Sequence, residues 1–158
     1  MNYLIKEQTI NKSQKQHIDF SKFVKKSIDY FKDIAELKGI QIVQYVQDDI
    51  MIEFVPEKLQ KVVDNTLSNA IKYGKEEKEV IVLLEKVGDK TILSIEDFGI
   101  GIKDPEKIFS RYYREDDTKG GFGIGLSIVN KIIHDENIEV HVKSEVNKGT
   151  KFEYVFNS

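Results

Sequence analysis

The sequence predicts an α+β protein: a two-layer α/β sandwich in which three helices cover one face of a mixed, mostly antiparallel sheet. Two observations support this prediction. Three segments place apolar residues at helical spacing, and the segments between them are short, rich in β-branched residues and bounded by turn residues. Because each such element has one face to bury, helices and sheet are expected to close over a single core.

The expected helices begin and end at residues that suit those positions. Ser21 is the expected N-cap of the first helix, and Gly39 ends it. Pro56 opens the second helix, where its missing N–H costs nothing. The helical segments are 21–38, 56–74 and 124–135.

The segments between the expected helices are predicted to form strands and one long loop. A turn at Gly88-Asp89 joins two strands into a hairpin. Residues 99–123 show little periodicity, and so long a loop in a compact domain usually serves as a lid or binding loop. The extended segments are 18–20, 40–46, 51–55, 79–87, 90–96, 139–144 and 150–156.

Length and composition restrict the function further. With 158 residues the chain suits one domain, expected over 17–158, with 1–16 as a tail or the remnant of an upstream dimerisation helix. No apolar run reaches the roughly 20 residues of a membrane span, so nothing in the chain is expected to cross a bilayer. The absence of cysteine excludes disulfides and cysteine catalysis, and a net charge of −3 disfavours nucleic acid as a partner.

Two asparagines lie one turn apart on the second helix. Asn65 and Asn69 share a side of the helix with Lys72 and Tyr73. A carboxamide oxygen suits Mg²⁺, a lysine can meet phosphate, and a tyrosine ring can lie near a base. Taken alone, the same residues also suit an ordinary exposed helix face.

Two glycine-containing segments follow in order. Asp97-Phe-Gly99-Ile-Gly101 comes after a strand, and a carboxylate there would accept a hydrogen bond from the exocyclic amine of adenine and repel the carbonyl of guanine. The segment 121–125, Gly-Phe-Gly-Ile-Gly, immediately precedes a helix, whose free amides and dipole suit phosphate. A dinucleotide fold is disfavoured, because its G-x-G-x-x-G pattern would lie within a βαβ unit.

Together these segments resemble the ATP-binding catalytic domain of bacterial sensor histidine kinases, a domain of Bergerat-type ATP-binding fold. The resemblance covers nearly the whole chain. It implies ATP and Mg²⁺ as cofactors, Asn69 as the metal ligand, and Asn65, Lys72 and Arg114 as the residues of phosphotransfer. The implied nucleotide contacts are Asn65, Asn69, Lys72, Tyr73, Asp97, Gly99, Gly101, Ile102, Phe109, Tyr113, Arg114, Gly121, Gly123, Ile124, Gly125, Leu126 and Thr150.

The segment Phe109-Ser-Arg111-Tyr-Tyr-Arg114 resembles the phenylalanine box of this family. The resemblance implies that aromatic residues pin one end of the lid to the core. Either Arg111 or Arg114 would reach the γ-phosphate, and Arg114 is favoured.

The resemblance implies an ATP-dependent protein-histidine kinase, present here as its catalytic domain only. Related ATPases carry a glutamate at the position of Asn65 that activates water, so this site is expected to transfer phosphate rather than hydrolyse ATP. None of His17, His134 and His141 has the sequence context of a phosphoacceptor, so the domain is not expected to phosphorylate itself alone. The implied partners are a histidine-bearing dimerisation domain of the same kinase and a response regulator, in a homodimeric parent protein. The resemblance also implies a cytoplasmic domain without membrane contact of its own, in a parent that can be an integral membrane sensor. The alternatives are a free-standing serine kinase of the anti-sigma type and a non-catalytic nucleotide-binding module.

Overall fold

The computed structural model describes residues 14–108 and 124–157. No helix in these ranges is both long enough and apolar enough to cross a membrane. Each predicted helix and strand is present, with ends close to the expected ones. In chain order the elements are β1 (Gln16–Asp19), α2 (Phe20–Leu37), β2 (Gln41–Val46), β3 (Met51–Phe54), α3 (Pro56–Tyr73), β4 (Glu79–Val87), β5 (Lys90–Asp97), a 3₁₀ turn (Pro105–Lys107), α4 (Ile124–Glu136), β6 (Glu139–Glu145) and β7 (Gly149–Asn157).

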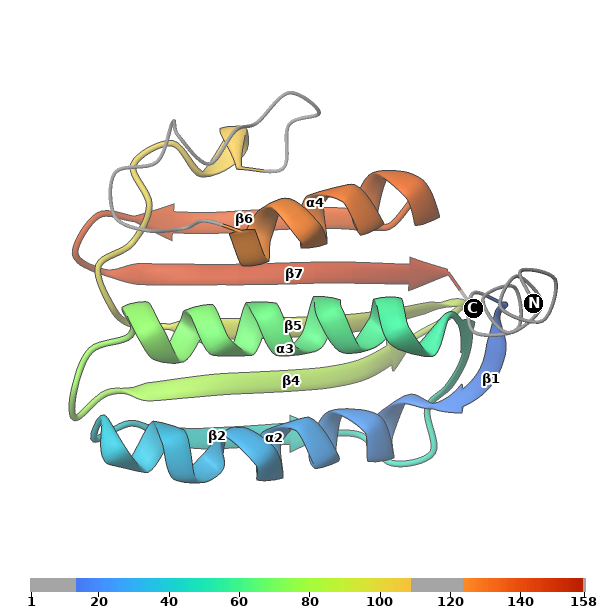
Figure 1. Cartoon of the computed structure of the whole chain (residues 1–158), viewed down its shortest axis with the longest axis horizontal. Helices are drawn as coiled ribbons and strands as arrows, with labels where there is room; N and C mark the ends of the chain where they lie inside the picture. Colours follow the sequence, from blue (N-terminus) through green and yellow to red (C-terminus); the bar gives the residue numbers. More distant parts are fainter. Residues whose placement is uncertain (1–13, 109–123, 158) are drawn as a thin grey trace, which may run out of the picture.

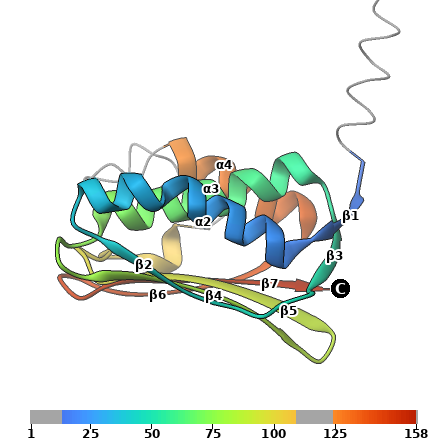
Figure 2. The same cartoon turned by 90° about the horizontal axis from the view of Figure 1, so that it is seen from below.

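The main sheet of the described chain has five strands in the order β2-β4-β5-β7-β6. β2 runs parallel to β4, and the other neighbours are antiparallel. β1 and β3 form a separate antiparallel pair. The three α-helices lie on one face of the main sheet (Figure 1 and Figure 2), which confirms the predicted two-layer α+β sandwich.

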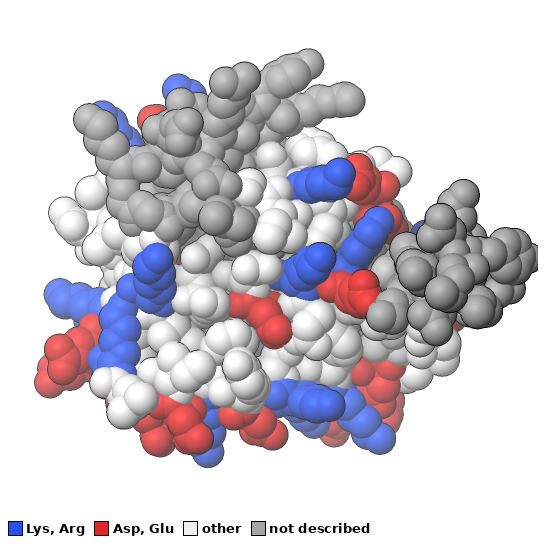
Figure 3. Space-filling model, in the orientation of Figure 1, with Lys and Arg blue, Asp and Glu red and all other residues white. Residues whose placement is uncertain are grey.

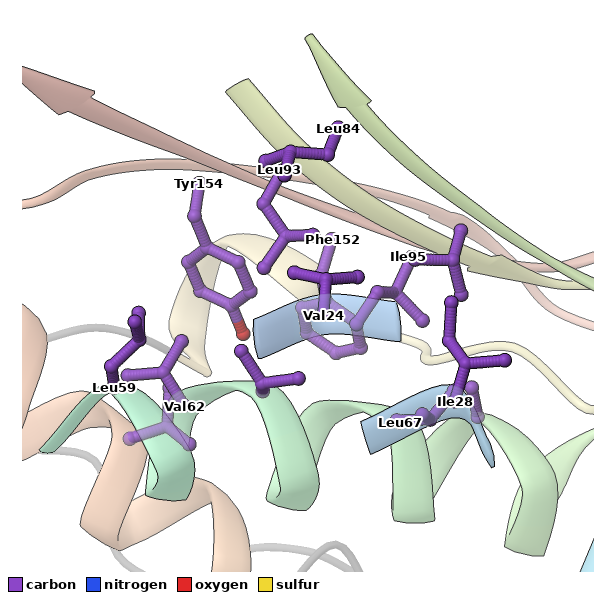
Figure 4. Packing of buried hydrophobic residues seen from close by; sticks show 14 of the residues in the cluster. Val24, Ile28, Leu59, Val62, Leu67, Leu84, Leu93, Ile95, Phe152 and Tyr154 are labelled. Atoms are coloured by element: carbon purple, nitrogen blue, oxygen red, sulfur yellow. The ribbon is translucent and has the colours of Figure 1, made fainter. Parts of the chain in front are cut away.

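The core lies between the helices and the sheet. Val24 of α2 and Val62 of α3 point toward inward-facing side chains of the sheet, among them Phe152 (Figure 4). Tyr154 is fully buried, and its hydroxyl oxygen lies 2.7 Å from the Thr66 hydroxyl oxygen. A buried hydroxyl without a partner would be costly, so this pair also sets how α3 sits on β7.

The first helix begins one residue earlier than predicted, and its N-cap is Asp19 rather than Ser21. The Asp19 carboxylate accepts a hydrogen bond from the Lys22 amide at 3.0 Å. Ser21 is buried, where its hydroxyl accepts from the Ile50 amide at 2.9 Å and donates to the Gln47 carbonyl at 2.6 Å. The prediction of Ser21 as the cap was wrong because its hydroxyl ties the helix to the β2–β3 connection instead.

Several element ends meet at one edge of the sandwich, on the left of Figure 1. There α3 ends at Tyr73, β5 ends at Asp97 and β7 begins at Gly149. α3 opens with Pro56 at its N-terminus, as predicted. The fold therefore brings the asparagine helix and the Asp97 turn, which are apart in the sequence, to the same edge.

Candidate nucleotide site

Asp97 is the last residue of β5, and only 5% of its surface is exposed. Its carboxylate accepts hydrogen bonds from the Gly99 amide, at 2.9 Å, and from the amide of Thr150. Thr150 lies directly opposite Asp97 in the β5–β7 register. Because an ionised carboxylate has about four acceptor positions, a carboxylate fixed by two amides can still accept a further donor, such as an exocyclic amine.

Burial raises the pKa of Asp97 to about 6, because removal from water disfavours the charged form. The hydrogen bonds from the Gly99 and Thr150 amides oppose this rise, as does the charge of Lys38, whereas the charge of Glu96 adds to it. At neutral pH the carboxylate is therefore mostly ionised at some cost in free energy. A ligand that donates a hydrogen bond to it would reduce that cost.

The turn that follows β5 is in contact with the end of α3. The Ile100 amide donates to the Tyr73 carbonyl over 3.2 Å. Gly99 passes so close that an added Cβ would lie 1.7 Å from the same carbonyl oxygen. Gly101 has a φ of +71°, and its added Cβ would lie 2.1 Å from the Glu145 carbonyl oxygen. Both positions therefore require glycine, and Tyr73, Gly99 and Gly101 of the predicted site lie together.

A serine on β6, which no sequence pattern marks, supports this turn. The Ser144 hydroxyl accepts from the Ile102 amide at 2.7 Å, donates to the Gly149 carbonyl at 2.9 Å and lies 2.8 Å from the Thr150 hydroxyl. Ile102 and Thr150 are 8% and 3% exposed. Here they hold the turn and the carboxylate in place, and their contact with a nucleotide stays a prediction. Only the β6–β7 register brings Ser144 opposite Thr150.

The two asparagines lie on the side of α3 that packs toward α4. Lys58 marks this side through its 2.7 Å ion pair with Glu136 of α4, and helical spacing places Asn65 and Asn69 on it as well. The Asn65 amide nitrogen donates to the Lys61 carbonyl at 2.8 Å, which turns its oxygen away from the helix. Asn69 is half-buried, and its buried amide nitrogen has no hydrogen-bond partner among the described residues. A buried N–H donor without a partner can meet an acceptor oxygen of a ligand, and the role of the Asn69 oxygen as a metal ligand stays a prediction.

Lys38, the C-cap residue of α2, holds the last turn of α3. The Lys38 ammonium group donates to the Ile71 carbonyl at 2.7 Å and also to the Lys72 carbonyl. Such terminal carbonyls have no intrahelical donor. Lys72 is exposed, with its ammonium nitrogen 5.2 Å from the centroid of the Tyr73 ring, so its phosphate contact stays a prediction. Sequence reasoning missed Lys38, although a basic residue near a helix end is a common partner for such carbonyls.

The predicted phosphate helix begins where expected, since α4 starts at Ile124 with Gly125 in its first turn. The free amides of a helix N-terminus suit an anion. Leu126 is fully buried in the core, so its side chain has a packing role. The predicted contacts that lie outside the described residues are Phe109, Tyr113, Arg114, Gly121 and Gly123.

The residues that can hold a metal are carboxamides. Among the residues that the structure describes, no three His, Cys, Asp or Glu side chains gather as a metal site would require. The oxygens of Asn69 and Asn65 suit Mg²⁺, which accepts few protein ligands and completes its shell with waters and phosphate oxygens. This donor set therefore fits a magnesium ion that arrives with a nucleotide rather than one held by the protein alone.

Similarity to known proteins shows the family to which the chain belongs. The sequence profile of the family described as histidine kinase-, DNA gyrase B-, and HSP90-like ATPase matches residues 54–157. The signal transduction histidine-protein kinase ArlS of Staphylococcus aureus (strain USA300) is 37% identical over 114 residues. The match covers 68% of this chain and 25% of ArlS, so the chain spans about a quarter of that relative's length. ArlS of strain COL gives the same values.

Solved structures share the fold. The nucleotide-free catalytic domain of histidine kinase ThkA has a TM-score of 0.77 at 22% identity, covering 91% of this chain and 95% of that chain. Full-length ShkA in complex with AMPPNP has a TM-score of 0.75 at 22% identity, covering 89% of this chain and 30% of that chain. Given the profile match across most of its length, the chain belongs to the histidine kinase-, DNA gyrase B-, and HSP90-like ATPase family, as an ATP-binding domain of the histidine kinase type.

Proposed function

We propose that this domain binds ATP with Mg²⁺ and delivers the γ-phosphate to a histidine on a separate segment of a sensor histidine kinase. The main support is the buried, amide-held carboxylate of Asp97, whose following turn is bonded to the end of the asparagine helix. A carboxylate there accepts a hydrogen bond from the exocyclic amine of adenine. It repels the carbonyl that guanine carries at the same position.

The site residues have distinct roles in the proposed complex. Asn69 holds the metal, Asn65 contacts the metal and phosphates, and Tyr73 lies near adenine. Lys72 and Arg114 approach the phosphates as cations. When bound, Mg²⁺ supplies neutralisation of the phosphate charge. The other proposed nucleotide contacts are Gly99, Gly101, Ile102, Phe109, Tyr113, Gly121, Gly123, Ile124, Gly125, Leu126 and Thr150.

The residue at position 65 supports phosphotransfer rather than hydrolysis. The carboxamide of Asn65 has no basic group that could take a proton from an attacking water. Asp64, the neighbouring carboxylate, projects about 100° away around the helix. We therefore expect the isolated domain to hydrolyse ATP slowly and to transfer phosphate only when an acceptor is supplied.

The acceptor and the later partner lie outside this chain. The histidine-containing domain belongs to the same kinase, in a parent protein that is a homodimer. A response regulator then receives the phosphate on an aspartate. Because ATP is the substrate, the domain lies on the cytoplasmic side of any membrane in which the parent is anchored.

The test is phosphotransfer from radiolabelled ATP with Mg²⁺ to the histidine-bearing segment of the same kinase, supplied as a separate polypeptide. The expected product is acid-labile, base-stable label on that polypeptide. Label on serine would instead support a serine kinase of the anti-sigma type. Tight nucleotide binding without transfer to any acceptor would support a non-catalytic nucleotide-binding module.

A further inference from the structure

Three polar side chains form a row across three neighbouring strands at the edge that carries the proposed nucleotide site. Ser144 of β6 lies opposite Thr150 of β7, and Thr150 lies opposite Asp97 of β5. Residues directly opposite on antiparallel strands present their side chains to the same face of the sheet. On β7 this is the helix-covered face, because Phe152 and Tyr154, two and four residues further on, are buried in the core. All three polar side chains therefore face the helices.

The partners of Ser144 determine where the hydrogen atoms of this row lie. A serine hydroxyl has one hydrogen and two lone pairs. The Ile102 amide, 2.7 Å away, can only donate, and the Gly149 carbonyl oxygen, 2.9 Å away, can only accept. The single hydrogen of Ser144 therefore goes to Gly149. The remaining contact, 2.8 Å to the Thr150 hydroxyl oxygen, is then a hydrogen bond only if Thr150 is the donor.

The bond to Ser144 uses the one hydrogen of the Thr150 hydroxyl, so the Thr150 oxygen can meet a ligand only as an acceptor. The neighbouring carboxylate of Asp97 is mostly ionised at neutral pH, and it also accepts only. Thr150 and Asp97 are 3% and 5% exposed, so water competes little for either group. The row therefore offers two adjacent acceptors to a ligand and no hydrogen.

Two adjacent acceptors distinguish purines by the group at the six-position of the base. Adenine carries an amino group there, with two hydrogens to donate, whereas guanine and hypoxanthine carry a carbonyl, which only accepts. Surface charge cannot make this distinction, because adenine and hypoxanthine are both neutral. The helix-covered face displays basic and acidic side chains side by side (Figure 3). Selection between these bases must therefore come from local donors and acceptors.

We propose that Ser144 is a positioning residue that determines base specificity. By accepting the hydrogen of Thr150, it prevents the Thr150 hydroxyl from donating to a carbonyl at the six-position. This role rests on the proposed function, and it extends that function from the binding of adenine nucleotides to the rejection of oxopurine nucleotides.

Removal of the Ser144 hydroxyl would release the hydrogen of Thr150. The freed hydroxyl could then rotate and donate to the carbonyl of an oxopurine, so the preference for adenine should fall. A purely structural role predicts a different result. The Ile102 amide and the Gly149 carbonyl would lose their partner, the turn would loosen, and all purine nucleotides would bind more weakly by the same factor. The ratio of two affinities therefore separates the two roles.

The experiment measures the affinities of Mg·ADP and of the magnesium complex of inosine diphosphate (IDP) by calorimetry, with the full chain. IDP differs from ADP only in its base, hypoxanthine. The variants are Ser144→Ala, Ser144→Thr, which keeps the hydroxyl, and Thr66→Val. Thr66→Val is the matched control, because it removes a hydroxyl from another buried pair, 2.7 Å from the Tyr154 hydroxyl oxygen, in the middle of α3.

We expect the wild type to prefer ADP over IDP, and Ser144→Ala to reduce this preference about fivefold, the effect of one neutral hydrogen bond. Ser144→Thr and Thr66→Val should keep the wild-type preference. An unchanged preference in Ser144→Ala would overturn the proposal, whether the two affinities fell equally or stayed the same.

A double variant shows whether Ser144 acts through Thr150. Thr150→Val removes the hydroxyl and keeps a side chain of similar shape. In this background Ser144→Ala should no longer change the preference between ADP and IDP, because no hydroxyl is left to be released. The same fivefold change in both backgrounds would mean that Ser144 acts through the turn itself, and would overturn the role of Thr150.

Failure of the proposed function would look different. If the wild-type chain bound neither nucleotide, the kinase proposal would fail. Neutron diffraction from a crystal of the nucleotide-free wild-type chain would still locate the hydroxyl hydrogens, and it does not depend on whether any variant folds. A Thr150 hydrogen that points to Ser144 would support the proposal, and a Ser144 hydrogen that points to Thr150 would overturn it.

Discussion

The two sides of α3 depart from ordinary surfaces in opposite ways. On the side toward α4, Asn69 is a partly buried polar group with one end unsatisfied. On the side toward α2, Ile34 and Leu37 are apolar groups left in water above a groove between the two helices. The α2 side also has one buried oxygen without a partner among the described residues, on Asp64, so the uncovered apolar groups are what set this side apart. One helix therefore separates the proposed nucleotide site from an apolar groove, and the Lys38 contact at its last turn touches both.

The substitution with the largest expected effect on nucleotide binding is Asp97→Asn. We expect Mg·ADP affinity to fall by about 100-fold, since a hydrogen bond to a buried charge contributes about 3 kcal/mol. Binding of the histidine-bearing polypeptide should not change. Isothermal titration would measure both, with Asp29→Asn on the exposed face of α2 as the control.

The stability of the same variant separates a binding role from a folding role. The pKa of Asp97 is raised in the fold, so its ionisation destabilises the free domain above about pH 6 and not below about pH 4. Asp97→Asn removes that charge but also replaces one of the two acceptor oxygens with an NH2 group, so at pH 7 the melting temperature should change only slightly. A large fall in melting temperature would mean that the carboxylate holds the fold together.

A second substitution tests whether the turn after Asp97 depends on close backbone packing. Gly101→Ala should lower the free energy of unfolding by roughly 2 to 3 kcal/mol, because the left-handed φ and the clash with the Glu145 carbonyl both cost energy. Gly88→Ala is the matched control: its φ is +61° and nothing lies within 4 Å of an added Cβ. It should cost only about 1 kcal/mol. Urea unfolding measures both, and equal losses would exclude a role for the clash.

Nucleotide binding should also depend on pH. Adenine recognition uses the ionised carboxylate, so Mg·ADP affinity should fall about tenfold per pH unit below about 6. In Glu96→Gln, the loss of a neighbouring negative charge lowers the pKa of Asp97. The midpoint of the pH dependence of Mg·ADP affinity should therefore move to lower pH. A midpoint identical in both proteins would assign the titration to the ligand.

The smallest effect is expected for Lys38→Met, because Lys38 acts on the site through the last turn of α3. Lys38→Met removes the hydrogen bonds to the Ile71 and Lys72 carbonyls, worth about 1 kcal/mol. We expect about threefold weaker Mg·ADP binding and a midpoint moved to higher pH, because the charge that opposes the rise in the pKa of Asp97 is gone. Lys32→Met, exposed on α2, is the control. Normal affinity with an unmoved midpoint would show that Lys38 has no part in the site.

Local patterns predicted much of this protein. Helical spacing, Pro56 and Gly39 were enough to locate the described helices, because amphipathic periodicity and backbone constraints act within a few residues. The turn at Asp97 was predicted by the same kind of signal. Its glycines meet the backbone of α3 and of the loop after β6, as the close contacts of Gly99 and Gly101 show.

Contacts between distant segments decided the rest. The parallel pairing of β2 with β4, the buried contact of Ser21 and the support of Thr150 by Ser144 all join elements far apart in the chain. The sequence by itself determined which of the described elements form, and it predicted which residue types belong to the site. Only the tertiary structure decided which polar side chains become partners and which apolar stripe stays in water, because each depends on burial by segments that no local pattern specifies.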